Sequence, residues 1–136
     1  MNNPRRATLL RWLKFNAVGA AGIVLQLAVL FALKSGLHVS YLMATALAVE
    51  AAVVHNFLWH ERFTWPDRVQ PSWRESLPRL VRFNVTTGVV SIAGNLAVTG
   101  ILVGAGGLNF MAANAIAIVA CSLFNFVVSD RYVFEK

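Results

Sequence analysis

Four long apolar stretches dominate the pattern of hydrophobic and polar positions along the chain. They cover residues 15–33, 41–59, 83–103 and 109–128. Each is close to the roughly 20 residues that a helix needs to cross the hydrocarbon core of a bilayer. None alternates between apolar and polar residues as a barrel strand does. The pattern therefore predicts an all-α, polytopic membrane protein with four transmembrane helices.

The basic residues lie outside these stretches, and their distribution predicts an orientation. Eleven of the twelve lysines and arginines precede the first stretch, separate the second from the third, or follow the fourth. Only Lys34 lies in a connection on the other side. Because cytoplasmic loops of membrane proteins are enriched in lysine and arginine, we expect both termini and the middle loop on the cytoplasmic side of the inner (plasma) membrane.

The composition supports a lipid environment. Of 136 residues, 57% are hydrophobic and 13% are charged, whereas about 25% are charged in a typical soluble domain. The single cysteine excludes an intramolecular disulfide framework and a multi-cysteine metal site. The formal charge of +6 is compatible with nucleic-acid binding, but apolar runs separate the basic residues. We therefore predict the lipid bilayer, and no nucleic acid, as the partner.

The chain contains an internal repeat. A shift of 69 residues brings Asn56 onto Asn125 and Arg62 onto Arg131. Each half is predicted to form a two-helix hairpin, and an even number of helices makes both copies insert in the same direction, as a parallel repeat. The predicted repeats cover about 9–66 and 77–134 within one membrane domain spanning 1–136.

Three polar residues lie deep in the predicted helices. Glu50 is the only ionisable residue near the centre of a stretch, where such a group costs about 2.5–3.5 kcal/mol and needs a partner or a purpose. It could line a cavity as a protonatable or substrate-binding group, or it could be a protonated acid bonded across helices. Gln26 and Asn95 occupy equivalent positions beside small residues, which favours interhelical hydrogen bonds over a substrate contact.

A second polar group lies near the predicted cytoplasmic ends of the second and fourth helices. Asn56 and Asn125 could form a weakly polar seam, to which His55 adds a titratable donor. Arg62 and Arg131 follow the asparagines by six residues. An interfacial guanidinium can bind a phosphate in a bidentate way, although ordinary anchoring by positive charge is the alternative.

We expect the eight polar residues of these two groups to form a path for substrate binding or translocation. They are Gln26, Glu50, His55, Asn56, Arg62, Asn95, Asn125 and Arg131. The sequence shows no catalytic motif. His60 and Glu61 are not followed by a histidine at the spacing of a helical zinc site. A phosphate loop, a dinucleotide turn and a nucleophile elbow are all missing from the sequence. The sequence therefore predicts no enzymatic activity, no cofactor and no metal.

The repeated order of an Asn-Phe pair, four residues, an arginine and an aromatic residue resembles the GtrA-like family of small four-span membrane proteins. The resemblance covers roughly residues 11–134. Many members carry Asn-Arg or Arg-Arg where this chain has His60-Glu61 and Ser129-Asp130, which leaves one arginine at each site. The matching segments are 14–19 and 55–65 in the first half, and 82–83 with Gly88, 124–126 and 131–134 in the second.

This resemblance implies a role in cell-surface polysaccharide synthesis. The expected activity is that of a flippase, or flippase component, that moves a polyprenyl-phosphate-linked sugar across the membrane. A scaffold for a polyprenyl-phosphate glycosyltransferase is one alternative, and a proton-coupled exporter of the small multidrug type, suggested by Glu50, is another. A homodimer is expected because side chains fill the core of a single four-helix bundle.

Overall fold

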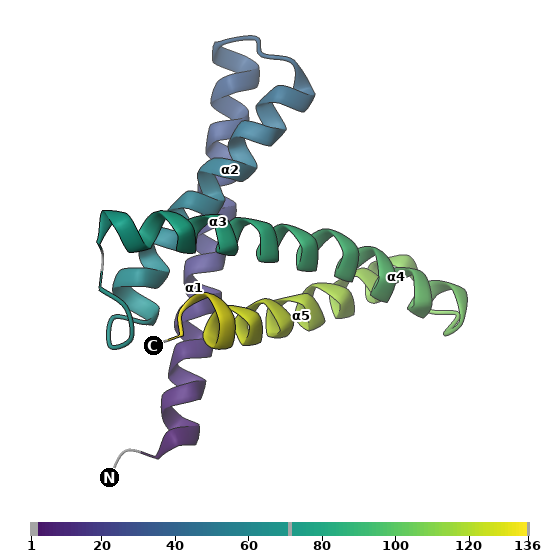
Figure 1. Ribbon diagram of the computed structural model, residues 1–136. Coiled ribbons are helices and arrows are strands. Elements are labelled where there is room, and N and C mark those ends of the chain that lie inside the picture. Colours follow the sequence, from purple (N-terminus) through teal and green to yellow (C-terminus); the bar gives the residue numbers. More distant parts are fainter. Residues whose placement is uncertain (1–2, 71, 136) are drawn as a thin grey trace. The chain divides into compact units, whose positions relative to one another are not determined.

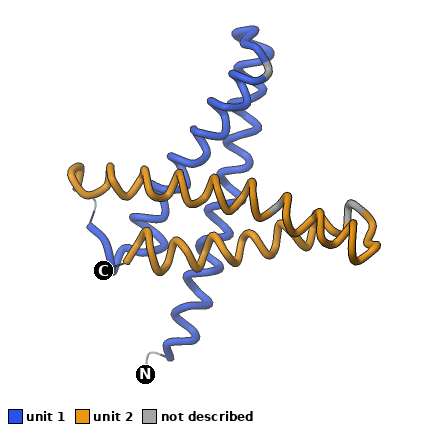
Figure 2. Tube along the Cα trace, turned by 45° about the vertical axis from the view of Figure 1, so that its right-hand side comes forward, with its two compact units in different colours: residues 1–71 blue, residues 72–136 orange. Residues whose placement is uncertain are grey.

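The computed structural model describes residues 3–70 and 72–135, and none of these residues forms a strand. Four of the helices are long and apolar enough to cross a membrane (Figure 1). The predicted all-α fold with four spanning helices is therefore confirmed. The chain divides into two compact units, Met1–Pro71 and Ser72–Lys136, shown in different colours in Figure 2.

The first unit is a helical hairpin. Its first helix, α1 (Pro4–Phe31), continues into a short π-helical turn, η1 (Ala32–Gly36). The second helix, α2 (Tyr41–Trp59), continues into another π-helical turn, η2 (His60–Thr64). In both views α1 and α2 run side by side. The short connection between η1 and α2 permits this antiparallel packing.

The N-terminus of α1 has strong local signals. Asn3 caps the helix, because its side chain accepts a hydrogen bond from the amide of Arg5 at 3.0 Å. Pro4 follows at the first helical position, where its missing N–H is not needed. The helix thus begins well before the predicted stretch 15–33, because the basic residues that precede that stretch extend the same helix.

Small residues bring α1 and α2 together. Ala44, Ala48 and Ala52 of α2 are buried, and small side chains allow close approach of helices in a membrane. The tightest contact involves Gly22 of α1, which faces Asn56 of α2. A Cβ atom added at Gly22 would lie 2.8 Å from Cγ and Nδ2 of Asn56. The missing side chain of Gly22 therefore makes room for the amide of Asn56.

The second unit has the same type of hairpin with one difference. Its first element is a long helical rod composed of α3 (Trp73–Val89), the π-helical turn η3 (Val90–Gly94) and α4 (Asn95–Gly104). The return helix is α5 (Phe110–Val128), which continues into the π-helical turn η4 (Ser129–Val133). The first rod of the second unit is thus interrupted by the π turn η3, whereas α1 in the first unit is a continuous α-helix.

The return helices α2 and α5 have the same local structure at a spacing of 69 residues. Helix α2 covers 41–59 and α5 covers 110–128, while η2 covers 60–64 and η4 covers 129–133. The buried apolar residues follow the same spacing. These pairs are Ala44 and Ala113, Ala48 and Ala117, Ala52 and Cys121, Phe57 and Phe126, and Trp65 and Phe134.

The contact between Gly22 and Asn56 yields a test of the hairpin packing. We expect Gly22→Ala to lower the free energy of unfolding by about 1–3 kcal/mol, because the new methyl group overlaps the Asn56 side chain. Gly19→Ala is the matched control, since a Cβ atom there meets nothing within 4 Å. Denaturant titration in detergent micelles measures both variants. Equal stability of the two variants would contradict this packing.

Candidate functional site

The turn η2 ends on a cluster of buried rings and polar groups. The amide of Trp65 donates a hydrogen bond to the carbonyl oxygen of His60 at 2.9 Å, and Trp65 is fully buried. The His60 ring stacks on Phe15 of α1 with centroids 4.7 Å apart, and Trp65 packs edge-on against His60. His60 Nδ1 lies 3.0 Å from the hydroxyl of Thr64. These contacts fix the end of α2 against α1.

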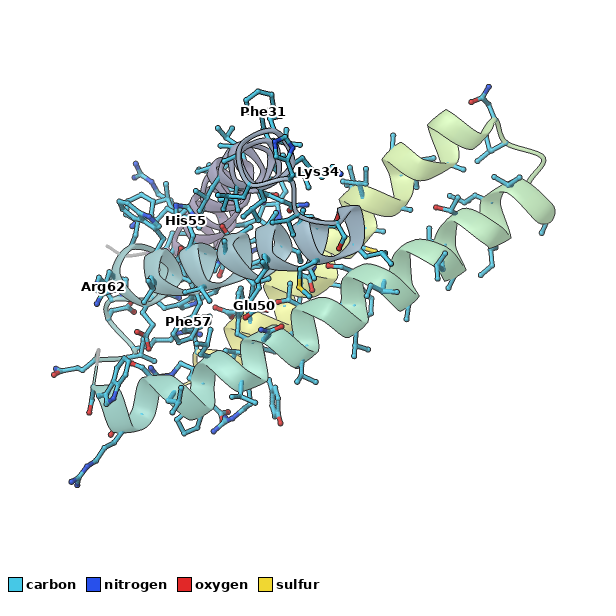
Figure 3. All side chains as sticks on the ribbon, turned by 90° about the horizontal axis from the view of Figure 1, so that it is seen from above. Phe31, Lys34, Glu50, His55, Phe57 and Arg62 are labelled. Atoms are coloured by element: carbon cyan, nitrogen blue, oxygen red, sulfur yellow. The ribbon has the colours of Figure 1, made fainter. Side chains whose placement is uncertain are left out.

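Because the rings hold η2 in place, they also set the direction of the residues between them. His60 and Glu61 are each only 1% exposed, whereas Arg62 is exposed. Arg62 donates one hydrogen bond, of 3.5 Å, to the carbonyl oxygen of Leu58. Figure 3 shows Glu50, His55, Phe57 and Arg62 following one another along α2 and η2. The turn therefore buries three polar residues, His60, Glu61 and Thr64, and leaves the arginine exposed.

Two basic residues of α1 bond to η2 and to the segment after it. Lys14 Nζ donates a hydrogen bond to the carbonyl oxygen of Phe63 at 3.1 Å and lies 4.7 Å from the centre of the Phe63 ring. Arg11 forms an ion pair with Asp67. Sequence reasoning did not include Lys14 among the site residues. The available signal was the repeated Lys14-Phe15-Asn16 motif, which recurs as Arg82-Phe83-Asn84.

The second unit reproduces this arrangement. Arg82 of α3 donates a hydrogen bond to the carbonyl oxygen of Tyr132 at 3.5 Å, and its guanidinium lies 5.7 Å from the centre of the Tyr132 ring. The amide of Phe134 donates to the carbonyl oxygen of Ser129 at 2.8 Å. Phe134 is fully buried and packs edge-on against Phe83. Arg131, like Arg62, is exposed.

Each asparagine of the predicted seam lies against the first helix of its own unit. His55 Nδ1 donates to Asn56 Oδ1 at 3.1 Å, and Asn56 faces Gly22. Asn125 Nδ2 donates to the hydroxyl of Ser91 at 3.2 Å. Oδ1 of Asn125 is buried and has no hydrogen-bond partner among the described residues. This oxygen is therefore a buried acceptor in the second unit.

The structure places the remaining predicted site residues apart from these turns. Glu50 is exposed on α2, and Gln26 is partly exposed on α1. The side chain of Asn95, at the start of α4, lies outside the described part of the structure. His55 lines a groove of about 230 Å³ beside α1, which Glu50 does not line. Within residues 3–70 and 72–135, no three His, Cys, Asp or Glu side chains are grouped to hold a metal ion.

The buried ring that follows each π turn yields a stability test. We expect Phe134→Ala to lower the free energy of unfolding by about 3–5 kcal/mol, because a fully buried ring is lost. Phe124→Ala is the control, since Phe124 is 67% exposed and its loss should have little effect. Denaturation in micelles gives both values. A smaller loss for Phe134→Ala than for Phe124→Ala would be inconsistent with a buried anchor.

Comparison with known proteins identifies the family. Comparison with curated proteins gives no match. The family described as GtrA/DPMS, transmembrane domain, matches residues 14–134. This range begins at Lys14 and ends at Phe134, so it includes both cation–carbonyl contacts and both π turns with their buried rings. The chain therefore belongs to the GtrA/DPMS transmembrane-domain family, and it is a multi-pass membrane protein.

Proposed function

We propose that this protein is a flippase, or a component of one, that moves a polyprenyl-phosphate-linked sugar across the inner membrane for cell-surface polysaccharide synthesis. Membership of the GtrA/DPMS family links the chain to the handling of polyprenyl-phosphate sugars. The observation that carries the proposal is that Arg62 and Arg131 are exposed at equivalent positions of two π turns, one in each unit.

The chemistry of the lipid matches this arrangement. A polyprenyl-phosphate-linked sugar has a long apolar chain that can stay in the bilayer, so only its phosphate and sugar need polar contacts. The planar guanidinium of an arginine suits the oxygens of a phosphate. A buried ring follows each arginine by three residues, Trp65 after Arg62 and Phe134 after Arg131, and π-helical turns are frequent at functional sites. Arg62 in the first unit and Arg131 in the second would therefore each offer a place to capture the phosphate.

The polar residues farther along the helices would contact the sugar. Oδ1 of Asn125 is a buried acceptor in need of a donor, and a sugar hydroxyl is such a donor. Asn56 and His55 offer a bonded amide and imidazole pair in the first unit. Glu50 would meet sugar hydroxyls, a contact that a glutamine at this position can also make. Translocation of this kind needs no covalent step, so the proposal includes no enzymatic activity.

The orientation completes the proposal. The excess of Lys and Arg in these segments supports a cytoplasmic location for both termini and the middle loop. Arg62 and Arg131 then lie at the cytoplasmic ends of α2 and α5, where lipid-linked sugars are made. A membrane glycosyltransferase that makes the substrate is the proposed neighbour, and a homodimer would enlarge the polar path.

Loss of both exposed arginines tests the capture of the phosphate. We expect Arg62→Ala/Arg131→Ala to weaken binding of a polyprenyl-phosphate sugar by about 10–100-fold, because charge-assisted hydrogen bonds are lost. The matched control is Arg5→Ala/Arg6→Ala, which removes two exposed arginines at the start of α1. Titration of the lipid into protein in nonionic micelles measures the affinity. Unchanged binding by the first double variant would contradict phosphate capture.

Reconstitution separates the flippase from its alternatives. We expect proteoliposomes of the purified chain to translocate a short-chain polyprenyl-phosphate sugar, and Glu50→Gln to retain this activity without a proton gradient. Loss of a fluorescent lipid from the outer leaflet measures the rate. Binding without translocation would favour a glycosyltransferase scaffold. Activity that requires a proton gradient and disappears in Glu50→Gln would favour a proton-coupled exporter.

A further inference from the structure

The first unit has an open groove that the proposed function does not yet use. Its floor is α1 and its wall is one face of α2 and η2. On the wall, Trp59 lies between His55 and Phe63, with ring centroids 6.3 Å and 6.2 Å away. The groove measures about 230 Å³ and is lined by Ala17, Val18, Ala21, His55, Trp59 and Phe63. The lining is therefore aliphatic and aromatic, with one imidazole.

A cation lies beside one of the residues that line this groove. Phe63 is the last residue of the aromatic wall, and Lys14 Nζ lies 4.7 Å from the centre of its ring. Lys14 also donates a hydrogen bond to the carbonyl oxygen of Phe63. An ammonium group has three N–H donors, so the ammonium is held in place by one of them and can offer others to an anion. The apolar groove thus lies next to a positively charged side chain.

We propose that this groove binds the first isoprene units of a single-chain polyprenyl-phosphate lipid, with the phosphate on Lys14. This inference rests on the proposed function and adds a site to it. The phosphate of such a lipid is an anion, either as a diester to a sugar or as a free monoester, and the ammonium group of Lys14 is a cation beside the groove. The branched, unsaturated chain suits a wall of aromatic rings, and small Ala17 and Ala21 leave room for it.

The second unit differs at the equivalent positions. A shift of 69 residues places Phe124 at the position of His55, Val128 at that of Trp59 and Tyr132 at that of Phe63. The central aromatic residue of the wall is thus replaced by valine. The cation is retained, because Arg82 lies over the Tyr132 ring. The proposed chain-binding groove is therefore a feature of the first unit, whereas cations and exposed arginines occur in both.

Photoaffinity labelling of the full-length protein in nonionic micelles tests the groove. The probe is a geranylgeranyl phosphate with a diazirine on its second isoprene unit, and mass spectrometry locates the label. We expect labelling within residues 17–21 and 55–63. Ala21→Phe should lower labelling about tenfold, because its ring fills the groove. Ala20→Phe adds the same ring at a neighbouring exposed residue outside the groove and should leave labelling unchanged.

The outcomes separate failure of the groove from failure of the proposed function. Specific labelling elsewhere, competed by unlabelled geranylgeranyl phosphate, would overturn the groove and leave the proposed function standing. Labelling that geranylgeranyl phosphate does not compete would overturn the groove, whereas the proposed function fails only if the polyprenyl-phosphate sugar is not translocated in proteoliposomes. Competition by phosphatidylglycerol as effective as that by geranylgeranyl phosphate would overturn the assignment to a single-chain lipid.

A second pair of ligands tests the role of Lys14. We expect Lys14→Gln to weaken binding of geranylgeranyl phosphate about tenfold and to leave binding of uncharged geranylgeraniol unchanged. Lys14→Arg should restore binding of the phosphate. Equal weakening of both ligands by Lys14→Gln would show that Lys14 only supports the wall through Phe63, and it would overturn the phosphate assignment.

Discussion

A backbone inside a bilayer must form its hydrogen bonds within its own helix, and the rest of this structure depends on that constraint. Open strands and irregular loops are not tolerated in lipid, so the apolar stretches form long helices. The helices α2 and α5 leave the regular pattern only at their last turn. There, the amides of Trp65 and Phe134 bond back to His60 and Ser129. The two π turns therefore end the helices while the amides of Trp65 and Phe134 stay hydrogen-bonded. Arg62 and Arg131 lie within these turns and are exposed.

The hydropathy pattern predicts the number of spanning helices because burial in lipid is a property of whole stretches. It does not predict that α1 begins at Pro4, because the residues before the first apolar stretch are basic and their helicity depends on packing. Nor does it predict the π turns. The change from an α to a π hydrogen bond is local. The buried rings that stabilise it, Trp65 and Phe134, pack against Phe15 and Phe83, which lie far away in the sequence.

The sequence likewise predicted only part of the candidate site. Arg62 and Arg131 follow from the repeat, since a matching residue pair is visible in the sequence. Lys14 and Arg82 also recur in a repeated motif, but the sequence does not show their partners, because each donates to a carbonyl oxygen 49 or 50 residues away. His60, Glu61 and Ser129 are each 1% exposed. The exposed arginines next to them are therefore the accessible polar groups of these turns.

The central claim is that a lipid phosphate contacts the cations at these turns. Solid-state NMR measures this contact directly, through dipolar coupling between the ³¹P of a bound polyprenyl-phosphate sugar and ¹⁵N in the side chains of arginine and lysine, with the protein in bilayers. The account predicts strong coupling to side-chain nitrogens in the wild-type protein, with the arginine coupling lost when Arg62 and Arg131 are both replaced by alanine. Absence of coupling at saturating lipid, or arginine coupling that survives this double replacement, would contradict it.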